Sequence, residues 1–276
     1  MSQPQQLPQI TLLKRIVAAL RADSRLRAAF LRGSFYHGQP DAYSDLDVVA
    51  VAADAEAETL VAIGRELLEA TGQVVWISVM NTRQPQLRAL FSGPIEVDLS
   101  VVTAEDLPPY DGWHILLDDD QLLHARSHPP QAFGPLLPEH VSMLCDEFWW
   151  SMFSSVSQLK RGQLWMALHL LDTCRAGLAQ IMRWRRDRER PSERFGDLER
   201  HLTAEDQQAL AQTLASYDVR HIAMALLCAA DAFEPAAREV ALRTGALYPA
   251  GLAHATKEFF LREFWSLIAP GPTISA

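Results

Sequence analysis

The spacing of hydrophobic residues changes character about halfway along the chain. In the first half, residues 10–32 and 56–71 carry apolar side chains at helical spacing, and the second segment ends at Gly72. Three runs rich in valine predict strands: 45–52, 74–79 and 95–102. Helices and strands mixed in this way predict a sheet that helices cover on one face.

The second half has a different pattern, because no convincing strand follows residue 133. Its apolar residues recur at helical spacing in four segments: 139–160, 163–187, 203–229 and 252–267. We therefore expect an α+β protein with two domains. The first, residues 1–132, has a mixed sheet with helices, and the second, residues 133–276, is an all-α helical bundle.

Composition narrows the class of protein. The 276 residues contain 25 Lys and Arg against 34 Asp and Glu, a formal charge of −9, which argues against a general nucleic-acid-binding protein. No apolar run approaches the ~20 residues that span a bilayer, and the N-terminal residues do not resemble a signal peptide. The three cysteines are far apart in sequence, which favours a reducing compartment over a disulfide framework. We expect a cytoplasmic protein without a membrane partner.

The segment 31–48 carries the clearest chemistry. Gly33-Ser34 would let the backbone approach a ligand closely, and ten residues later the chain reads Asp45-Leu46-Asp47-Val48. On a strand, Asp45 and Asp47 project from the same face. Two neighbouring carboxylates repel each other unless a cation lies between them, and hard oxygen ligands of this kind suit Mg²⁺.

A third acid is expected from a neighbouring strand. Asp98, between Val97 and Leu99, fits this role, because a buried strand does not tolerate an unpaired aspartate. Glu96 lies two residues earlier and would project from the same face, so it is the alternative. Carboxylates that bridge Mg²⁺ ions would support an in-line attack on phosphorus by a substrate hydroxyl group.

These residues resemble a known signature. Gly33-Ser34, ten intervening residues and Asp45-Leu46-Asp47 resemble the polymerase beta nucleotidyltransferase superfamily. The wider segment 33–45 is similar to the two-domain lincosamide nucleotidyltransferases and, more distantly, to the aminoglycoside adenylyltransferases. Residues 159–162, Leu-Lys-Arg-Gly, are similar to the helical domain of the lincosamide group.

The resemblance implies an enzyme that transfers a nucleoside monophosphate to a hydroxyl group of a small molecule. AMP from ATP is the first expectation for the donor, Mg²⁺ for the cofactor, and a lincosamide- or aminoglycoside-type antibiotic for the acceptor. The catalytic and metal-binding residues would then be Asp45, Asp47 and Asp98. The nucleotide-binding residues would be Gly33, Ser34, His37 and Lys160, and the helical domain would bind the acceptor across a cleft.

Two of these residues have ordinary structural alternatives. His37 also fits an exposed loop histidine, and Lys160 also fits a solvated charge at a helix end, where the helix dipole favours it. Other functions stay open as well. A toxin–antitoxin nucleotidyltransferase that modifies a protein is one, and a nucleotide-binding regulator without turnover is another. The expected partners are a nucleoside triphosphate and a small acceptor but no nucleic acid, and a homodimer is compatible with the sequence.

Overall fold

The computed structural model describes residues 7–268, apart from 54, 82–84, 108–111, 125–135, 187–194 and 197. The chain divides into two compact units, residues 1–131 and 132–276, and each is described by itself. The boundary expected at 132/133 lies outside the described residues.

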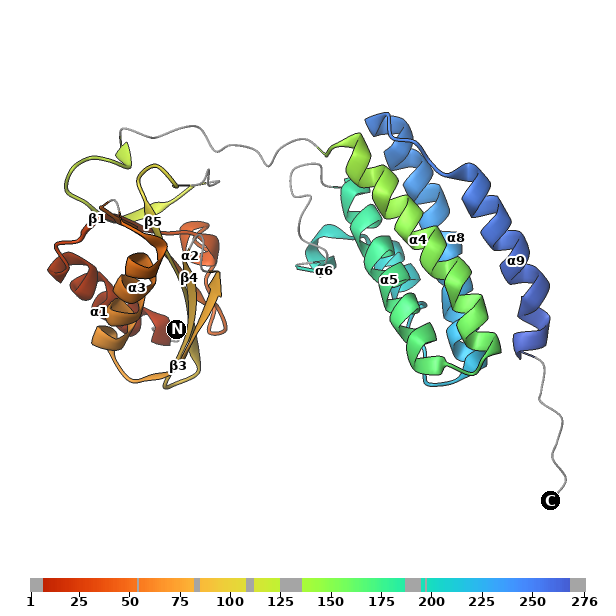
Figure 1. Cartoon of the computed structure of the whole chain (residues 1–276), viewed down its shortest axis with the longest axis horizontal. Helices are drawn as coiled ribbons and strands as arrows, with labels where there is room; N and C mark the ends of the chain where they lie inside the picture. The colour runs from red at the N-terminus through yellow and green to blue at the C-terminus, as the bar shows by residue number, and fades with distance from the viewer. Residues whose placement is uncertain are drawn as a thin grey trace, which may run out of the picture. The chain divides into compact units, whose positions relative to one another are not determined.

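The first unit is built from a sheet and helices (Figure 1). Its elements are α1 (Pro8–Ala22), β1 (Leu26–Leu31), α2 (Gly33–Tyr36), β2 (Leu46–Ala52), α3 (Ala57–Thr71), β3 (Val74–Asn81), β4 (Gln86–Phe91), β5 (Ile95–Thr103) and β6 (His114–Asp118). Within the described residues the six strands form one sheet in the order β3-β4-β5-β2-β1-β6. β2 and β5 are parallel, and the other neighbouring strands are antiparallel. The predicted mixed sheet with helices is confirmed.

The two long helices of this unit cover one face of the sheet. Apolar side chains of α1 and α3 pack with alternate residues of β2, β4 and β5 into the larger of its two hydrophobic cores. The approach is close at Gly64 of α3, where a Cβ atom would lie 2.8 Å from Leu87 Cδ1. The smaller core lies on the opposite face of β1 and β2 and includes Phe30, Val49 and Val51. Because side chains alternate along a strand, Asp47 belongs to this opposite face.

One predicted element of the first unit is wrong. The expected helix over 10–32 ends at Ala22, and residues 26–31, Leu-Arg-Ala-Ala-Phe-Leu, form strand β1 instead. Five of these six residues are buried, because β1 lies between β2 and β6 and is covered on both faces. A centrally buried strand loses the alternation that would reveal it, and the pairing with its neighbours overrides helix propensity. The pattern also did not predict β4.

The second unit is helical, as expected. Its elements are α4 (Pro138–Lys160), α5 (Leu164–Arg186), α6 (Leu198–His201), α7 (Ala204–Ala211), α8 (Val219–Thr244) and α9 (Ala250–Ile268). The long helices α4, α5, α8 and α9 enclose one core (Figure 1), in which the rings of Phe148 and Phe233 stack 3.7 Å apart. The segment 203–229, predicted as one helix, contains α7 and the start of α8. Asp218 separates the two helices by capping α8, since its side chain accepts a hydrogen bond from His221 N.

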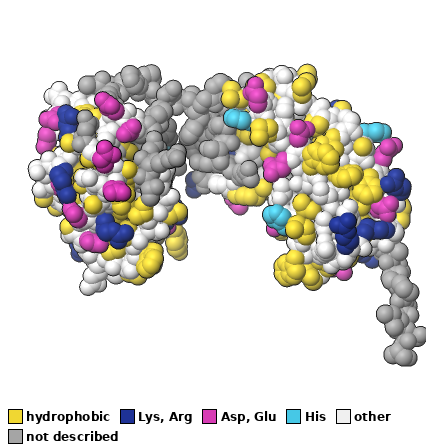
Figure 2. Space-filling model, in the orientation of Figure 1, with side chains coloured by type: hydrophobic (Ala, Val, Ile, Leu, Met, Phe, Trp, Pro, Cys, Tyr) yellow, Lys and Arg dark blue, Asp and Glu magenta, His cyan; other side chains and the backbone are white. Residues whose placement is uncertain are grey.

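Surface charge, helix hydrophobicity and cysteine burial can each be compared with what the composition predicts. On the face of the first unit shown in Figure 2, acidic and basic side chains are interspersed, so that face presents no continuous basic area among the described residues. Within the same described ranges, every helix is too short or too polar to cross a membrane. Cys145 and Cys174 are buried free thiols and Cys228 is a partly buried one, and burial raises the pKa of Cys145 to about 12.

Candidate active site

The parallel pairing of β2 with β5 brings three carboxylates together. Asp47 and Asp98 are direct partners in the register, and Asp45 precedes the first residue of β2. One carboxylate oxygen from each of these three residues lies within 4.8 Å of the others. The residues that the sequence proposed as metal ligands therefore form one cluster of hard oxygen donors, which is the donor set that Mg²⁺ prefers.

Burial and like charge make this cluster electrostatically costly. Burial, followed by the negative charge of Asp45, raises the pKa of Asp47 from 3.8 to about 6. Arg32, whose Nη2 atom lies 3.5 Å from Asp47 Oδ1, lowers this pKa but does not offset the effects that raise it. A carboxylate whose negative charge is not neutralised by its neighbours is typical of a binding or catalytic site, since a bound cation would lower its electrostatic free energy.

Glu96, the alternative third acid, lies outside the cluster. It pairs with Leu90 of β4 in the register, two residues before Asp98 on the same strand face. Its side chain is 44% exposed, compared with 10% for Asp98. The structure thus places Asp98 beside Asp47 and leaves Glu96 closer to solvent.

Gly33 and Ser34 adjoin the carboxylates through the single turn α2. Gly33 has a φ of +64°, and a Cβ atom on it would lie 2.1 Å from Asp47 Oδ2, so only glycine leaves room for that carboxylate. The Ser34 hydroxyl is buried and makes no hydrogen bond to any described residue. A buried hydroxyl without a protein partner fits the predicted contact with a ligand oxygen.

His37 follows α2 on the surface. Its backbone N–H donates to Gly33 O at 3.1 Å, and its ring lies 5.0 Å from the ring of Tyr36 in an edge-on contact. The histidine is therefore on the same loop as Gly33 and Ser34. This exposure fits the alternative of an ordinary surface histidine, and the predicted phosphate contact stays a prediction.

A glutamine that the sequence analysis did not single out holds the loop before Asp45. Gln9 of α1 is 2% exposed, and its Nε2 atom donates to Ser44 O at 2.8 Å and to Asp41 O at 3.2 Å. Within the loop, the Asp41 carboxylate accepts from Tyr43 N at 2.8 Å. These bonds fix the approach to β2 and with it the position of Asp45. Gln9 occupies an apolar position of the α1 pattern, and a polar residue there is the signal that could have found it.

Two arginines were also missed, and both contact the carboxylates. Arg32 precedes α2, and Arg88 lies on β4 opposite Asp98, where its guanidinium contacts that carboxylate through two nitrogens. Hydrogen bonding to Asp98 raises the pKa of Arg88. No short-range signal marks Arg88, because its partner lies ten residues away across a hairpin.

Lys160 is the remaining residue that the resemblance assigned to nucleotide binding. It ends α4 in the second unit, where Nζ lies 3.0 Å from Glu263 Oε2 and 2.9 Å from Ser266 Oγ, both on α9. The hydrogen bond from Lys160 lowers the pKa of Glu263. The structure shows Lys160 in an ion pair within its own unit, and its predicted triphosphate contact stays a prediction.

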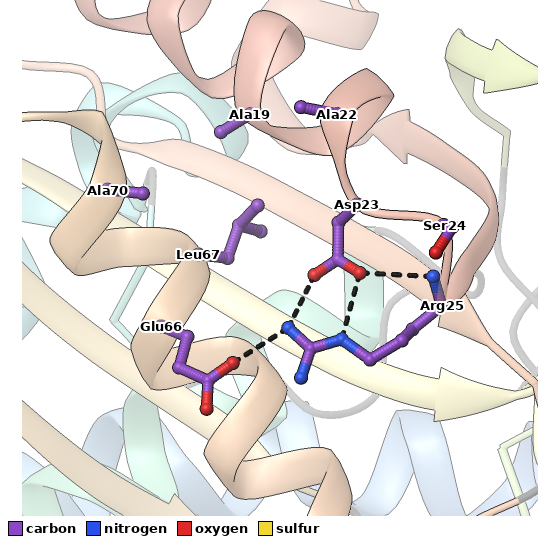
Figure 3. Close-up of a pocket in the computed structure, with 8 residues that line it drawn as sticks. All are labelled: Ala19, Ala22, Asp23, Ser24, Arg25, Glu66, Leu67 and Ala70. Atoms are coloured by element: carbon purple, nitrogen blue, oxygen red, sulfur yellow. Dashed lines mark hydrogen bonds and ion pairs between the residues drawn. The ribbon is translucent and has the colours of Figure 1, made fainter.

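A pocket lies at the other end of the same sheet (Figure 3), between the end of α1 and helix α3. Its charged groups satisfy one another, since Arg25 binds the Asp23 carboxylate at 2.7 and 2.8 Å and reaches Glu66 at 2.8 Å. Arg25 precedes β1, whereas Gly33 follows that strand. The pocket is therefore separate from the carboxylate cluster.

Comparisons with known proteins identify a matching family and two structures with partial similarity. The family model described as streptomycin adenylyltransferase matches residues 9–262. Among solved structures, an aminoglycoside 6-adenyltransferase from Bacillus subtilis is 15% identical over 97% of this chain and 100% of its own, with a TM-score of 0.45. Terminal uridylyl transferase 4 from Trypanosoma brucei with bound GTP is 16% identical over 36% of each chain, with a TM-score of 0.28. No curated protein matches the chain.

Proposed function

The chain belongs to the streptomycin adenylyltransferase family, and we propose that it transfers AMP from ATP, with Mg²⁺, to a hydroxyl group of an aminoglycoside-type acceptor. The predicted relationship to aminoglycoside adenylyltransferases is confirmed by this membership. The closer resemblance to lincosamide nucleotidyltransferases stays a prediction. The observation that carries the proposal is the carboxylate cluster, whose oxygens from Asp45, Asp47 and Asp98 lie within 4.8 Å of one another.

The three aspartates would hold Mg²⁺ through their carboxylate oxygens. When bound, the metal supplies Lewis-acid polarisation of the phosphate and of the attacking oxygen. It would also compensate the burial and like charge that raise the pKa of Asp47. Gly33 would let the triphosphate approach Asp47 closely, and the buried hydroxyl of Ser34 would donate to a phosphate oxygen.

In the proposed reaction, the acceptor hydroxyl oxygen forms a bond to the α-phosphorus of ATP as the bond to pyrophosphate breaks. The hydroxyl proton passes to the Asp98 carboxylate, which lies beside Asp47 and is held almost free of solvent. The products are the O-adenylylated acceptor and pyrophosphate. Asp98 suits the role of proton acceptor because its short side chain and its register position beside Asp47 limit where its oxygens can lie.

The test is an assay of purified protein with ATP and Mg²⁺ over a panel of streptomycin, other aminoglycosides and lincosamides. Pyrophosphate release and the gain of one AMP on the acceptor, measured by mass spectrometry, are the expected results. Asp98→Asn should abolish both, whereas Asp120→Asn, which removes an exposed carboxylate paired with Arg27, should change neither. If no acceptor of the panel receives AMP, the proposed substrate class is wrong. Transfer at the wild-type rate by Asp98→Asn would remove the proposed proton acceptor.

A further inference from the structure

Arg88 is in direct contact with Asp98, one of the candidate metal ligands. Arg88 Nε lies 2.9 Å from Asp98 Oδ1, and Nη2 lies 3.0 Å from Asp98 Oδ2. The guanidinium therefore occupies both oxygens of the carboxylate that the proposed function assigns to Mg²⁺. A metal ion that binds Asp98 must share this side chain with a positive charge that is already present.

The same nitrogen has a second carboxylate within reach. Arg88 Nε lies 2.8 Å from Glu96 Oε1, as close as it lies to Asp98. A guanidinium Nε carries one hydrogen, so it can make a well-aligned hydrogen bond to only one of these carboxylates at a time. In the structure the two hydrogen bonds of Arg88 go to Asp98, and Glu96 lies close enough to compete for Nε–H.

The burial of the two acids indicates which of them can adapt. Asp98 has a 10% exposed side chain and lies beside Asp47 in the register, so it is held in place. Glu96 and Arg88 are 44% and 49% exposed, which leaves both free to reorient at little cost. A change in the Asp98 environment is therefore expected to move Arg88 towards Glu96 and not to move Asp98.

We propose that Arg88 is the resident counter-cation of the carboxylate cluster, and that Glu96 takes over its Nε–H when a divalent cation binds Asp98. This inference rests on the proposed function, because it assumes that the cluster binds such a cation. Arg88 then competes with the metal, and Glu96 weakens that competition by offering the guanidinium another partner. The pair would set the metal affinity of the site without touching nucleotide or acceptor.

The proposal predicts opposite changes for the two partners. Arg88→Gln should bind Mn²⁺, used here as the probe, about three- to tenfold more tightly than the wild type, since a competing charge is removed. Glu96→Gln should bind it more weakly by a similar factor, because Arg88 then has only Asp98. In the Arg88→Gln background, Glu96→Gln should have little further effect.

This last result separates a direct partnership from the general electrostatic field. An electrostatic field alone would also make Arg88→Gln bind Mn²⁺ more tightly and Glu96→Gln bind it more weakly. The two effects would then be additive, so Glu96→Gln would weaken Mn²⁺ binding equally with and without Arg88. The measurement is a double-mutant cycle of Mn²⁺ dissociation constants, obtained by isothermal titration calorimetry at fixed pH and ionic strength without nucleotide. Arg27→Gln is the matched control, since it removes an exposed guanidinium of β1 that pairs with Asp120 and not with the candidate metal ligands.

Each outcome of the double-mutant cycle either supports or overturns the proposal. Coupled effects with the predicted signs support the proposal, and additive effects or weaker binding by Arg88→Gln overturn it. Failure of the wild type to bind Mn²⁺ would overturn the metal assignment in the proposed function and this inference with it. Binding by the wild type with additive effects would overturn this inference alone. If Arg88→Gln does not fold, Arg88→Lys serves instead. It keeps the charge but lacks the planar fork, so it should bind Mn²⁺ more tightly than the wild type by a smaller factor.

Discussion

Two largely enclosed aspartates, one in each unit, have opposite electrostatic environments, with side chains that are 18% exposed at Asp47 and 7% exposed at Asp206. Burial, and then the negative charges of Asp45, Asp98 and the more distant Glu96, raises the pKa of Asp47 in the first unit to about 6. Asp206, on α7 in the second unit, is buried, but Arg185 and Arg186 both bind its carboxylate. Burial alone would raise the pKa of Asp206, and the hydrogen bonds from Arg185, Arg186 and Thr203 outweigh it and lower the pKa.

The difference indicates what each carboxylate contributes. A buried acid with its own cations stabilises the local structure and has little capacity left for a ligand. A buried acid surrounded by other acids costs stability, and a fold keeps such a group where a bound cation or a reaction uses it. This contrast favours a structural role for Asp206 and supports the metal-binding role that the proposed function gives to Asp47.

Replacement of Asp47 should have the largest effect, and it should be on activity. Asp47→Asn, like Asp45→Asn, should lower the rate of AMP transfer by roughly a thousandfold or more, because the metal loses a ligand. Stability should stay unchanged or rise slightly, since like-charge repulsion is relieved. Steady-state kinetics and urea unfolding measure the two effects. Activity within about tenfold of the wild type would contradict the metal assignment.

Replacement of Asp206 should have the reverse effect. Asp206→Asn should lower the free energy of unfolding by about 3 kcal/mol, because Arg185 and Arg186 lose a buried counter-charge. The rate of AMP transfer under folding conditions should not change. Asp172→Asn is the control, since the 63% exposed side chain of Asp172 pairs with Arg175. This substitution should lower the free energy of unfolding by less than about 1 kcal/mol. Equal destabilisation by both variants would break the comparison.

The space beside the Asp47 carboxylate can be tested with two glycines. Gly33 and Gly38 both have positive φ angles, but a Cβ atom would meet Asp47 Oδ2 at Gly33 and nothing within 4 Å at Gly38. Both alanine variants should lose about 1 kcal/mol through backbone strain. Gly33→Ala should lose about 2 kcal/mol more and most of the activity, because the carboxylate must move. Thermal unfolding and kinetics compare the pair, and similar behaviour of the two variants would show that Asp47 is not confined by α2.

The smallest effect concerns the pH dependence of stability. The pKa of Asp47 is raised on folding, so the folded protein holds this proton more tightly and its stability falls as pH rises from about 4 to 6. The loss attributable to Asp47 should be about 1–2 kcal/mol, since solvent reaches part of the side chain. Urea unfolding of wild type and Asp47→Asn, in metal-free buffer from pH 4 to 7, measures it.

Asp206 should behave in the opposite way in the same experiment. Its pKa is lowered on folding, so its contribution is present above about pH 4 and is lost as pH falls through the folded-state pKa. The difference between wild type and Asp206→Asn should therefore stay constant from pH 4 to 7. A difference that varies over this range as the Asp47 difference does would remove the contrast between the two sites.

Much of the architecture was accessible from local patterns. The change from mixed elements to helices alone follows from hydrophobic spacing, and the valine-rich runs at β2, β3 and β5 were each found as strands. Strand β1 was not found, because a strand buried on both faces has no alternation and Ala, Leu and Arg favour a helix. Strand β4 was not found either, although Leu87, Ala89 and Phe91 alternate with more exposed residues.

The sequence by itself determined that Gly33-Ser34 precedes two aspartates spaced to share one face of a strand, because that spacing is a local property of the chain. Which acid lies beside Asp47 was decided only by the tertiary structure, since the parallel register of β2 and β5 pairs Asp47 with Asp98. The same holds for Arg88, which β4 places opposite Asp98. Register depends on packing across the whole sheet, and a shift by one residue would turn these side chains to the other face.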